Sequence, residues 1–183
     1  MGIRTAGALE SEFYEGTVEE IVEYVSQTDP ASAAKIQSVE ARLASLAQAA
    51  SDPDKAVEFY QFQSIRAKAD ELLARELEKR SPDEHQQLIG EWHQTYSIGT
   101  AILYHGYNFT GRAVPFTLTW PNFNWWPYDC NDAASSVKGW GVNVLFEHAG
   151  YRGRRFYTVG VYAEYPDLRL AGFDNLTSSI IAA

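Results

Sequence analysis

The sequence predicts an α+β protein with segregated parts: an N-terminal helical bundle or hairpin over residues 1–97 and an all-β sandwich of two Greek keys over residues 98–183. Three observations predict this division. Residues 1–97 hold 18 acidic and 9 basic side chains, whereas residues 98–183 hold 6 of each. Apolar residues recur at helical spacing in the first part. Short strand-like runs, separated by Gly and Pro, fill the second part.

Capping signals and proline mark the starts of the predicted helices. Thr17-Val-Glu-Glu20 is a capping box and opens a helix that extends to about Ser26. Proline suits the first position of a helix, so Asp29-Pro30 and Asp52-Pro53 predict two further starts. Ser81-Pro-Asp-Glu84 is a second capping box and opens a helix that ends near Tyr96. His85 and His93 on this last helix are predicted to be solvated surface residues.

Two apolar seams predict how the central helices pack. They comprise Ile36, Val39, Leu43, Leu46 and Ala50 in the first helix, and Phe62, Ile65, Ala69 and Leu72 in the second. Two helices joined by a few residues should pack as an antiparallel hairpin. The seams fit either an intramolecular core or a module for self-association or partner docking, with Phe59, Tyr60 and Phe62 as anchors.

A repeat of 42–43 residues organises the second part. Tyr104-His-Gly-Tyr-Asn-Phe-Thr-Gly111 aligns with Phe146-Glu-His-Ala-Gly-Tyr-Arg-Gly153, each an aromatic, four residues, an aromatic, one residue and a glycine. Downstream, Asn131-Asp-Ala-Ala-Ser-Ser136 aligns with Asp174-Asn-Leu-Thr-Ser-Ser179. Strands are expected at Ala101–Tyr104, Ala113–Thr119, Val142–Phe146 and Arg155–Val159, with glycine at the hairpin turns.

These paired motifs resemble the microbial βγ-crystallin domains, over about residues 99–183. The resemblance implies two Greek-key motifs and two bound Ca²⁺ ions, one at each loop of the form Asn/Asp-Asn/Asp-x-x-Ser/Thr-Ser. The implied ligands are Asn131, Asp132, Ser135, Asp174, Asn175 and Ser178, together with backbone carbonyls near His105 and Glu147 from the other motif's hairpin. Ser136 and Ser179 are implied to pin the hairpins. Side-chain and carbonyl oxygens are the ligands that calcium prefers, and one carboxylate per loop implies modest affinity.

The segment Trp120–Tyr128 is unusually aromatic. Trp120, Phe123, Trp125 and Trp126 could form a contact patch for a protein or carbohydrate, or could cover the sandwich and its junction with the helices. Cys130 lacks a neighbouring base in sequence and is expected to be an unreactive thiol.

The remaining features exclude several classes of protein. No apolar stretch reaches the roughly 18 residues of a membrane span. The acidic first part disfavours nucleic acid as a partner. The start of the chain lacks a secretory signal, which predicts a cytoplasmic protein unless the chain is the processed form of a secreted one. No catalytic motif is recognised, so a non-enzymatic protein is expected.

Three functions remain open at this stage. The first is a calcium-binding protein whose ions stabilise the sandwich while the helical part mediates assembly, as a homo-oligomer or with a protein partner. The second is a protease inhibitor of the crystallin-fold type, with the Trp-rich segment as its contact surface. The third is a structural component of a larger particle, docked through the helices.

Overall fold

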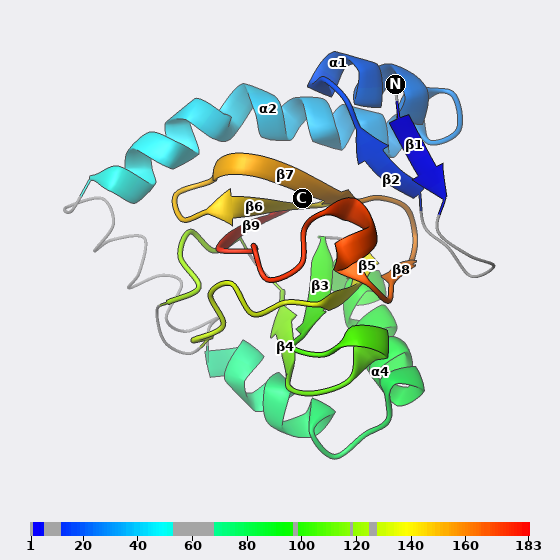
Figure 1. The fold of residues 1–183 in the computed structure, drawn as a ribbon, viewed down its shortest axis with the longest axis vertical. Coiled ribbons are helices and arrows are strands. Elements are labelled where there is room, and N and C mark those ends of the chain that lie inside the picture. Colours follow the sequence, from blue (N-terminus) through cyan, green and yellow to red (C-terminus); the bar gives the residue numbers. More distant parts are fainter. Residues whose placement is uncertain (1, 6–11, 53–67, 97–98, 118, 125–127) are drawn as a thin grey trace.

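The computed structural model describes residues 2–5, 12–52, 68–96, 99–117, 119–124 and 128–183 (Figure 1). The first of these residues form a two-stranded antiparallel sheet that the sequence did not predict, β1 (Gly2–Thr5) with β2 (Glu12–Glu15). Helices α1 (Val18–Ser26) and α2 (Pro30–Ser51) follow. Residues 68–77 are also helical, and α4 (Pro82–Tyr96) ends the helical part.

The helix starts predicted at Thr17, Asp29-Pro30 and Ser81 are confirmed by their hydrogen bonds, whereas the first turns of the helix predicted to start at Asp52-Pro53 lie outside the described residues. At α1, the Thr17 hydroxyl accepts from the Glu20 N–H, and the Glu20 carboxylate accepts from the Thr17 N–H. Asp29 caps α2 through the Ser32 N–H at 3.0 Å, directly before Pro30. Ser81 and Glu84 form the same reciprocal pair as Thr17 and Glu20. Each pair satisfies N–H groups that have no partner within the helix.

Two antiparallel sheets form the β part. The four-stranded sheet has the order β4-β3-β5-β8 and the three-stranded sheet the order β7-β6-β9. The strands are β3 (Thr100–Tyr104), β4 (Ala113–Phe116), β5 (Ser136–Trp140), β6 (Asn143–His148), β7 (Arg152–Thr158), β8 (Ala163–Tyr165) and β9 (Ser179–Ala182). Pro115 lies in β4 at the edge of its sheet, where a residue without an N–H costs no ladder hydrogen bond.

The two repeats exchange a strand. β8 belongs to the second repeat yet pairs with β5 of the first. In return, Trp120 of the first repeat pairs with Ile180 in β9, through backbone hydrogen bonds of 2.8 and 2.9 Å in the two directions. The aromatic core between the sheets therefore draws on both repeats.

The helices cover the outer faces of the two sheets. Ile21, Val25 and Ile36 from α1 and α2 share a buried cluster with Val144 and Ile181 of the three-stranded sheet. Leu77 and Ile89 share another with Ile102, Tyr104 and Trp140 of the four-stranded sheet. Figure 1 shows α2 on one side of the β layers and α4 on the other.

This arrangement corrects the predicted helical hairpin. α2 and residues 68–77 are consecutive helical segments among the described residues, but they lie on opposite sides of the sandwich. The seam of α2 faces the three-stranded sheet. The second predicted seam is wrong where it is described, because Leu72 is 62% exposed and the residues that pack toward the four-stranded sheet are Leu73 and Leu77. Phe62 and Ile65 of that seam lie outside the described residues. The proposed anchors Phe59, Tyr60 and Phe62 lie outside the described residues.

Buried polar contacts also join the helices to the sandwich. Asp70, 2% exposed, accepts hydrogen bonds from the Thr117 N–H (3.2 Å) and the Tyr128 hydroxyl (2.7 Å). His85 lies between the Tyr104 hydroxyl (2.9 Å) and the Leu77 carbonyl (2.6 Å).

The prediction of a solvated His85 is therefore wrong, because its ring is buried between α4 and the four-stranded sheet.

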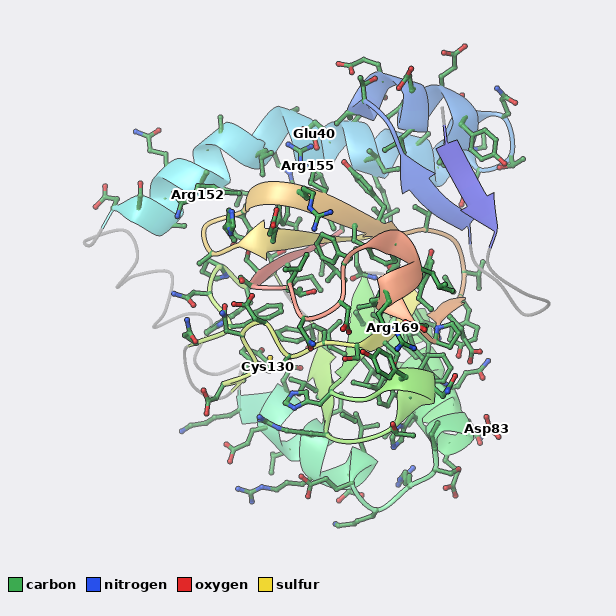
Figure 2. All side chains as sticks on the ribbon, in the orientation of Figure 1. Glu40, Asp83, Cys130, Arg152, Arg155 and Arg169 are labelled. Atoms are coloured by element: carbon green, nitrogen blue, oxygen red, sulfur yellow. The ribbon has the colours of Figure 1, made fainter. Side chains whose placement is uncertain are left out.

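On the opposite side of the molecule, Arg155 of β7 pairs with Glu40 of α2 (Figure 2). The side chain of His93 is outside the described part. Among the helices that the structure describes, none combines the length and apolar character needed to cross a bilayer.

Candidate metal centre

Two equivalent hairpins frame the site. In each, the first aromatic ring meets the second edge-on: Tyr104 and Phe109 at 5.6 Å between centroids, Phe146 and Tyr151 at 5.8 Å. Phe109 and Tyr151 both have a φ of 60°. The glycines two residues later, Gly111 and Gly153, also have positive φ, which glycine adopts without steric cost.

The last serine of each loop pins its own hairpin, as the resemblance implies. Ser136 Oγ donates to the Gly106 carbonyl (2.6 Å) and accepts from the Phe109 N–H (3.0 Å). Ser179 Oγ makes the same two bonds with the His148 carbonyl (2.8 Å) and the Tyr151 N–H (3.2 Å). The prediction for these two serines is confirmed.

Three oxygen atoms converge at Ser178. Its hydroxyl lies 3.0 Å from Asp132 Oδ1 and 2.9 Å from the Glu147 carbonyl oxygen. The Glu147 carboxylate turns away and accepts a hydrogen bond from the Arg154 N–H, which lowers its pKa. A carboxylate, a hydroxyl and a backbone carbonyl at these separations form part of a shell for a hard cation.

The equivalent contact of Ser135 is longer than that of Ser178. The Ser135 hydroxyl lies 3.4 Å from Asn175 Oδ1, so an amide stands where the other site has a carboxylate. The His105 N–H bonds to the Arg112 carbonyl, and a ligand role for the His105 carbonyl stays a prediction.

Each cluster combines both loops, which corrects the expected assignment of one site to one loop. Asp132 of the first loop meets Ser178 of the second, and Asn175 of the second meets Ser135 of the first. The Glu147 carbonyl comes from the same repeat as Ser178 and from the other repeat relative to Asp132. The expected source of the carbonyl for the loop that holds Asp132 therefore stays a prediction.

Backbone hydrogen bonds fix this crossing. The Asp132 N–H donates to the Thr177 carbonyl (3.0 Å), and the Asn175 N–H donates to the Ala134 carbonyl (2.8 Å). Asp132 and Asn175 have φ values of 52° and 53°, a left-handed conformation that Asp and Asn adopt more readily than most residues.

The first residue of each loop contacts its neighbour. Asn131 Nδ2 donates to Asp132 Oδ2 (2.8 Å), and Asn175 Nδ2 donates to Asp174 Oδ2 (3.2 Å). Asn131 and Asp174 therefore support the residues that face the serines. Among the described residues, no group of three or more His, Cys, Asp or Glu is placed to hold a metal, so any ion here would depend largely on neutral oxygens.

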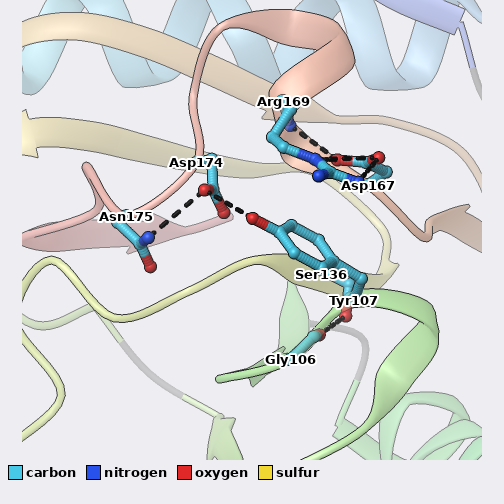
Figure 3. Close-up of polar contacts among 7 residues, drawn as sticks. All are labelled: Gly106, Tyr107, Ser136, Asp167, Arg169, Asp174 and Asn175. Carbon is cyan, nitrogen blue, oxygen red and sulfur yellow. Dashed lines mark hydrogen bonds and ion pairs between the residues drawn. The ribbon is translucent and has the colours of Figure 1, made fainter.

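A tyrosine that sequence reasoning missed joins the second loop. The Tyr107 hydroxyl donates to Asp174 Oδ2 at 3.0 Å (Figure 3), and this bond is the main cause of the raised pKa of Tyr107. The two residues are 67 positions apart, and no spacing rule connects them.

The predicted aromatic patch is not exposed where the structure describes it. Trp120 and Phe123 are 2% and 0% exposed and lie in the core between the sheets, with Phe123 stacked on Phe116 at 4.4 Å. Trp125 and Trp126 lie outside the described residues. Cys130 is buried as well, and burial raises the pKa of its thiol to about 12, which agrees with an unreactive cysteine.

Comparison with solved structures returns βγ-crystallin domains. One from Ciona intestinalis is 22% identical and matches over 46% of this chain and 99% of its own length, with a TM-score of 0.42. One from an archaeon is 29% identical over 46% of this chain and 98% of its own, with a TM-score of 0.41. Spherulin 3a from Physarum polycephalum is 26% identical over 46% and 82%, with a TM-score of 0.38. Neither a protein-family model nor a curated protein matches the chain.

The C-terminal half is the part of the chain that these solved βγ-crystallin domains match, and it consists of a four-stranded and a three-stranded antiparallel sheet. These matches are to the same family, and over the same half of the chain, as the resemblance predicted from the sequence motifs. The predicted order of helices followed by two antiparallel sheets is confirmed. The crystallin-like half carries every candidate calcium ligand, whereas the helices cover its two sheets.

Proposed function

We propose that the chain is a non-enzymatic calcium-binding protein in which two ions tie the two crystallin motifs together. The observation that carries this proposal is the convergence of the Ser178 hydroxyl, Asp132 Oδ1 and the Glu147 carbonyl within 3.0 Å of the serine oxygen. A calcium ion takes six to eight oxygens at about 2.3–2.6 Å, so these three atoms would supply a partial shell that water completes.

The two sites are unequal under this proposal. The Ser178 site has a carboxylate in contact with the serine, whereas the Ser135 site has the Asn175 amide there. Because a negative ligand strengthens calcium binding, we expect the Ser178 site to fill first. Both affinities are expected in the range of about 10⁻⁶ to 10⁻³ M, since few ligand charges are present.

The role of calcium under this proposal is to stabilise the fold. Each ion would bridge a loop of one repeat to a loop of the other, and such a site exists only when both repeats are folded. Saturation at 100 times the dissociation constant adds about 2.7 kcal/mol to the free energy of unfolding per site.

Contacts with the sandwich suggest a role for the helical part besides the predicted docking or assembly. Its buried residues pack on the sheets, and Asp70, His85 and Glu40 bond to the sandwich. We therefore propose that the helices stabilise the sandwich from both sides. Partner docking or self-association would then use surfaces other than these seams. The alternative function as a protease inhibitor is less well supported, because Trp120 and Phe123, two of the four residues proposed to contact the protease, are buried.

Calcium titration into the chelator-stripped full chain, followed by calorimetry, tests the proposal. Two bound ions of different affinity are expected, with a melting temperature that is higher in calcium than in chelator. Absence of binding heat together with unchanged melting would overturn it. Magnesium at the same concentration is the matched control, since its smaller octahedral shell fits a partial shell of neutral oxygens poorly.

A further inference from the structure

The two loops arrange the same pair of chemical groups in opposite order. In the first loop the amide of Asn131 stands behind the carboxylate of Asp132, which faces Ser178. In the second loop the carboxylate of Asp174 stands behind the amide of Asn175, which faces Ser135. At the Ser135 site the carboxylate of Asp174 is therefore separated from the serine by the amide of Asn175.

Asp174 determines which end of the Asn175 amide faces the site. An ionised carboxylate only accepts hydrogen bonds, so it must take the Nδ2 group of Asn175. The amide oxygen is thereby left to face Ser135, where a cation would need it. The position of Asp174 thus controls the orientation of the Asn175 oxygen.

Asp174 is in turn held by the first hairpin. Its Oδ2 accepts from the Tyr107 hydroxyl at 3.0 Å (Figure 3). The guanidinium carbon of Arg169 lies 3.8 Å from the centre of the Tyr107 ring and packs on its face. Asp167 holds this guanidinium in place, since its carboxylate accepts from Arg169 Nη2 (2.6 Å) and Nε (2.8 Å). Asp174 Oδ1 is buried, and no hydrogen bond to it is formed by the residues described.

The second hairpin has no counterpart to this contact. The repeat aligns Tyr107 with Ala149, whose methyl side chain can form no hydrogen bond. The Tyr107 hydroxyl therefore supports the loop whose carboxylate stands behind the amide, and the aligned residue of the second hairpin can give the first loop no such bond.

Resting on the calcium function proposed above, we propose that Tyr107 is a positioning residue for the Ser135 site. Its hydroxyl holds the Asp174 carboxylate where that group orients Asn175 and adds negative charge near the ion. The Ser178 site, whose carboxylate faces the serine directly, does not depend on Tyr107.

Tyr107→Phe tests this inference, because it removes the hydroxyl and keeps a ring beneath Arg169. Calcium is titrated calorimetrically into the full chain, in the native background and in a Ser178→Ala background that leaves the Ser135 site. A three- to tenfold loss of affinity is expected at the Ser135 site, with less than a twofold change at the Ser178 site.

The matched control is Tyr162→Phe. This tyrosine also bonds to a carboxylate, that of Glu164, but it lies against Trp140 in another part of the sandwich. If the Tyr107 hydroxyl were purely structural, Tyr107→Phe would lower the melting temperature in chelator and leave the ratio of the two calcium affinities unchanged. This is the result expected for the control variant Tyr162→Phe. That outcome in Tyr107→Phe would overturn the inference.

A double-mutant cycle with Asp174→Asn sharpens the test. If Tyr107 acts through Asp174, Tyr107→Phe should cause no further loss of affinity once Asp174 is Asn. Additive losses would contradict the inference. A native chain that binds no calcium would instead defeat the calcium function itself, whereas two intact sites in Tyr107→Phe would defeat only the role of Tyr107.

Discussion

Asp132 Oδ1 and Ser178 Oγ lie 3.0 Å apart although their residues are 46 positions apart and belong to different repeats. The contact places a carboxylate of the first loop beside the hydroxyl of the second. A cation bound there would join the two repeats directly, and the first prediction tests this pair.

Asp132→Asn should weaken the Ser178 site about tenfold, because it removes the carboxylate charge while keeping the size and left-handed conformation of the residue. Calorimetric titration measures the affinity. The matched control is Asp129→Asn, an exposed Asp that also has positive φ but has no contact with Ser178 in the structure. Equal losses in both variants would point to general electrostatic attraction.

Asn175→Asp should strengthen the Ser135 site about tenfold, since it places a carboxylate beside the serine hydroxyl. It also sets two carboxylates side by side with Asp174, which should lower the free energy of unfolding in chelator by about 1 kcal/mol. Relative to the native chain, the melting temperature should therefore rise in calcium and fall in chelator. Movement in the same direction would contradict a cation site at Ser135.

Ser136→Ala should lower the free energy of unfolding by about 1–3 kcal/mol, because it leaves the Phe109 N–H and the Gly106 carbonyl without their partner. Urea unfolding in chelator measures the loss. Ser51→Ala, at the exposed end of α2, is the control and should change stability by less than about 0.5 kcal/mol. A loss seen only in calcium would mean that Ser136 serves the ion.

Asp70→Asn should lower the free energy of unfolding by about 2–3 kcal/mol, since the amide presents an NH₂ group to donors that need a charged acceptor. Unfolding followed separately by helical and tyrosine signals should still show one transition, because helices and sheets share buried clusters. Glu71→Gln, which disturbs only a surface ion pair with Arg75, should cost about 0–1 kcal/mol. Two separate transitions would contradict the stabilising role of the helices.

Asp29→Ala should lower the free energy of unfolding by about 1 kcal/mol at pH 7 by removing the cap of α2. Hydrogen bonds from Ser32 lower the pKa of Asp29 below its usual 3.8, so the ionised carboxylate stabilises the fold above that pH. The difference from the native chain should shrink as pH falls from 3.8 through the lower pKa of the folded state. Urea unfolding at pH 7 and at a pH below 3.8 measures this difference. Asp29→Asn is the control and should keep most of the stability that the cap provides.

Local chemistry made much of the crystallin-like half predictable from sequence. The aromatic, glycine and serine positions act within one hairpin and its own loop, so their spacing reveals them, as Ser136 with Phe109 and Ser179 with Tyr151 illustrate. The capping boxes at Thr17 and Ser81 are local in the same way.

Contacts between distant residues were not predictable by the same reasoning. An apolar seam says that a helix face is buried but not against what, and so α2 was assigned to a neighbouring helix instead of a sheet. His85 was misjudged because polarity describes a side chain and not its surroundings, and for the same reason aromatic density left open whether Trp120 was exposed or buried. The pairing of Asp132 with Ser178 depends on how the two repeats cross, which no spacing within one loop encodes.

The pairing between the two repeats also has a consequence for a single repeat on its own. A lone copy of the repeat would lack the strand that its partner lends, leaving the edge of β5 or β9 open to pairing. A second copy of the repeat would cover this edge by pairing with it, so a repeat on its own is expected to self-associate. Separately expressed repeats should then associate with each other.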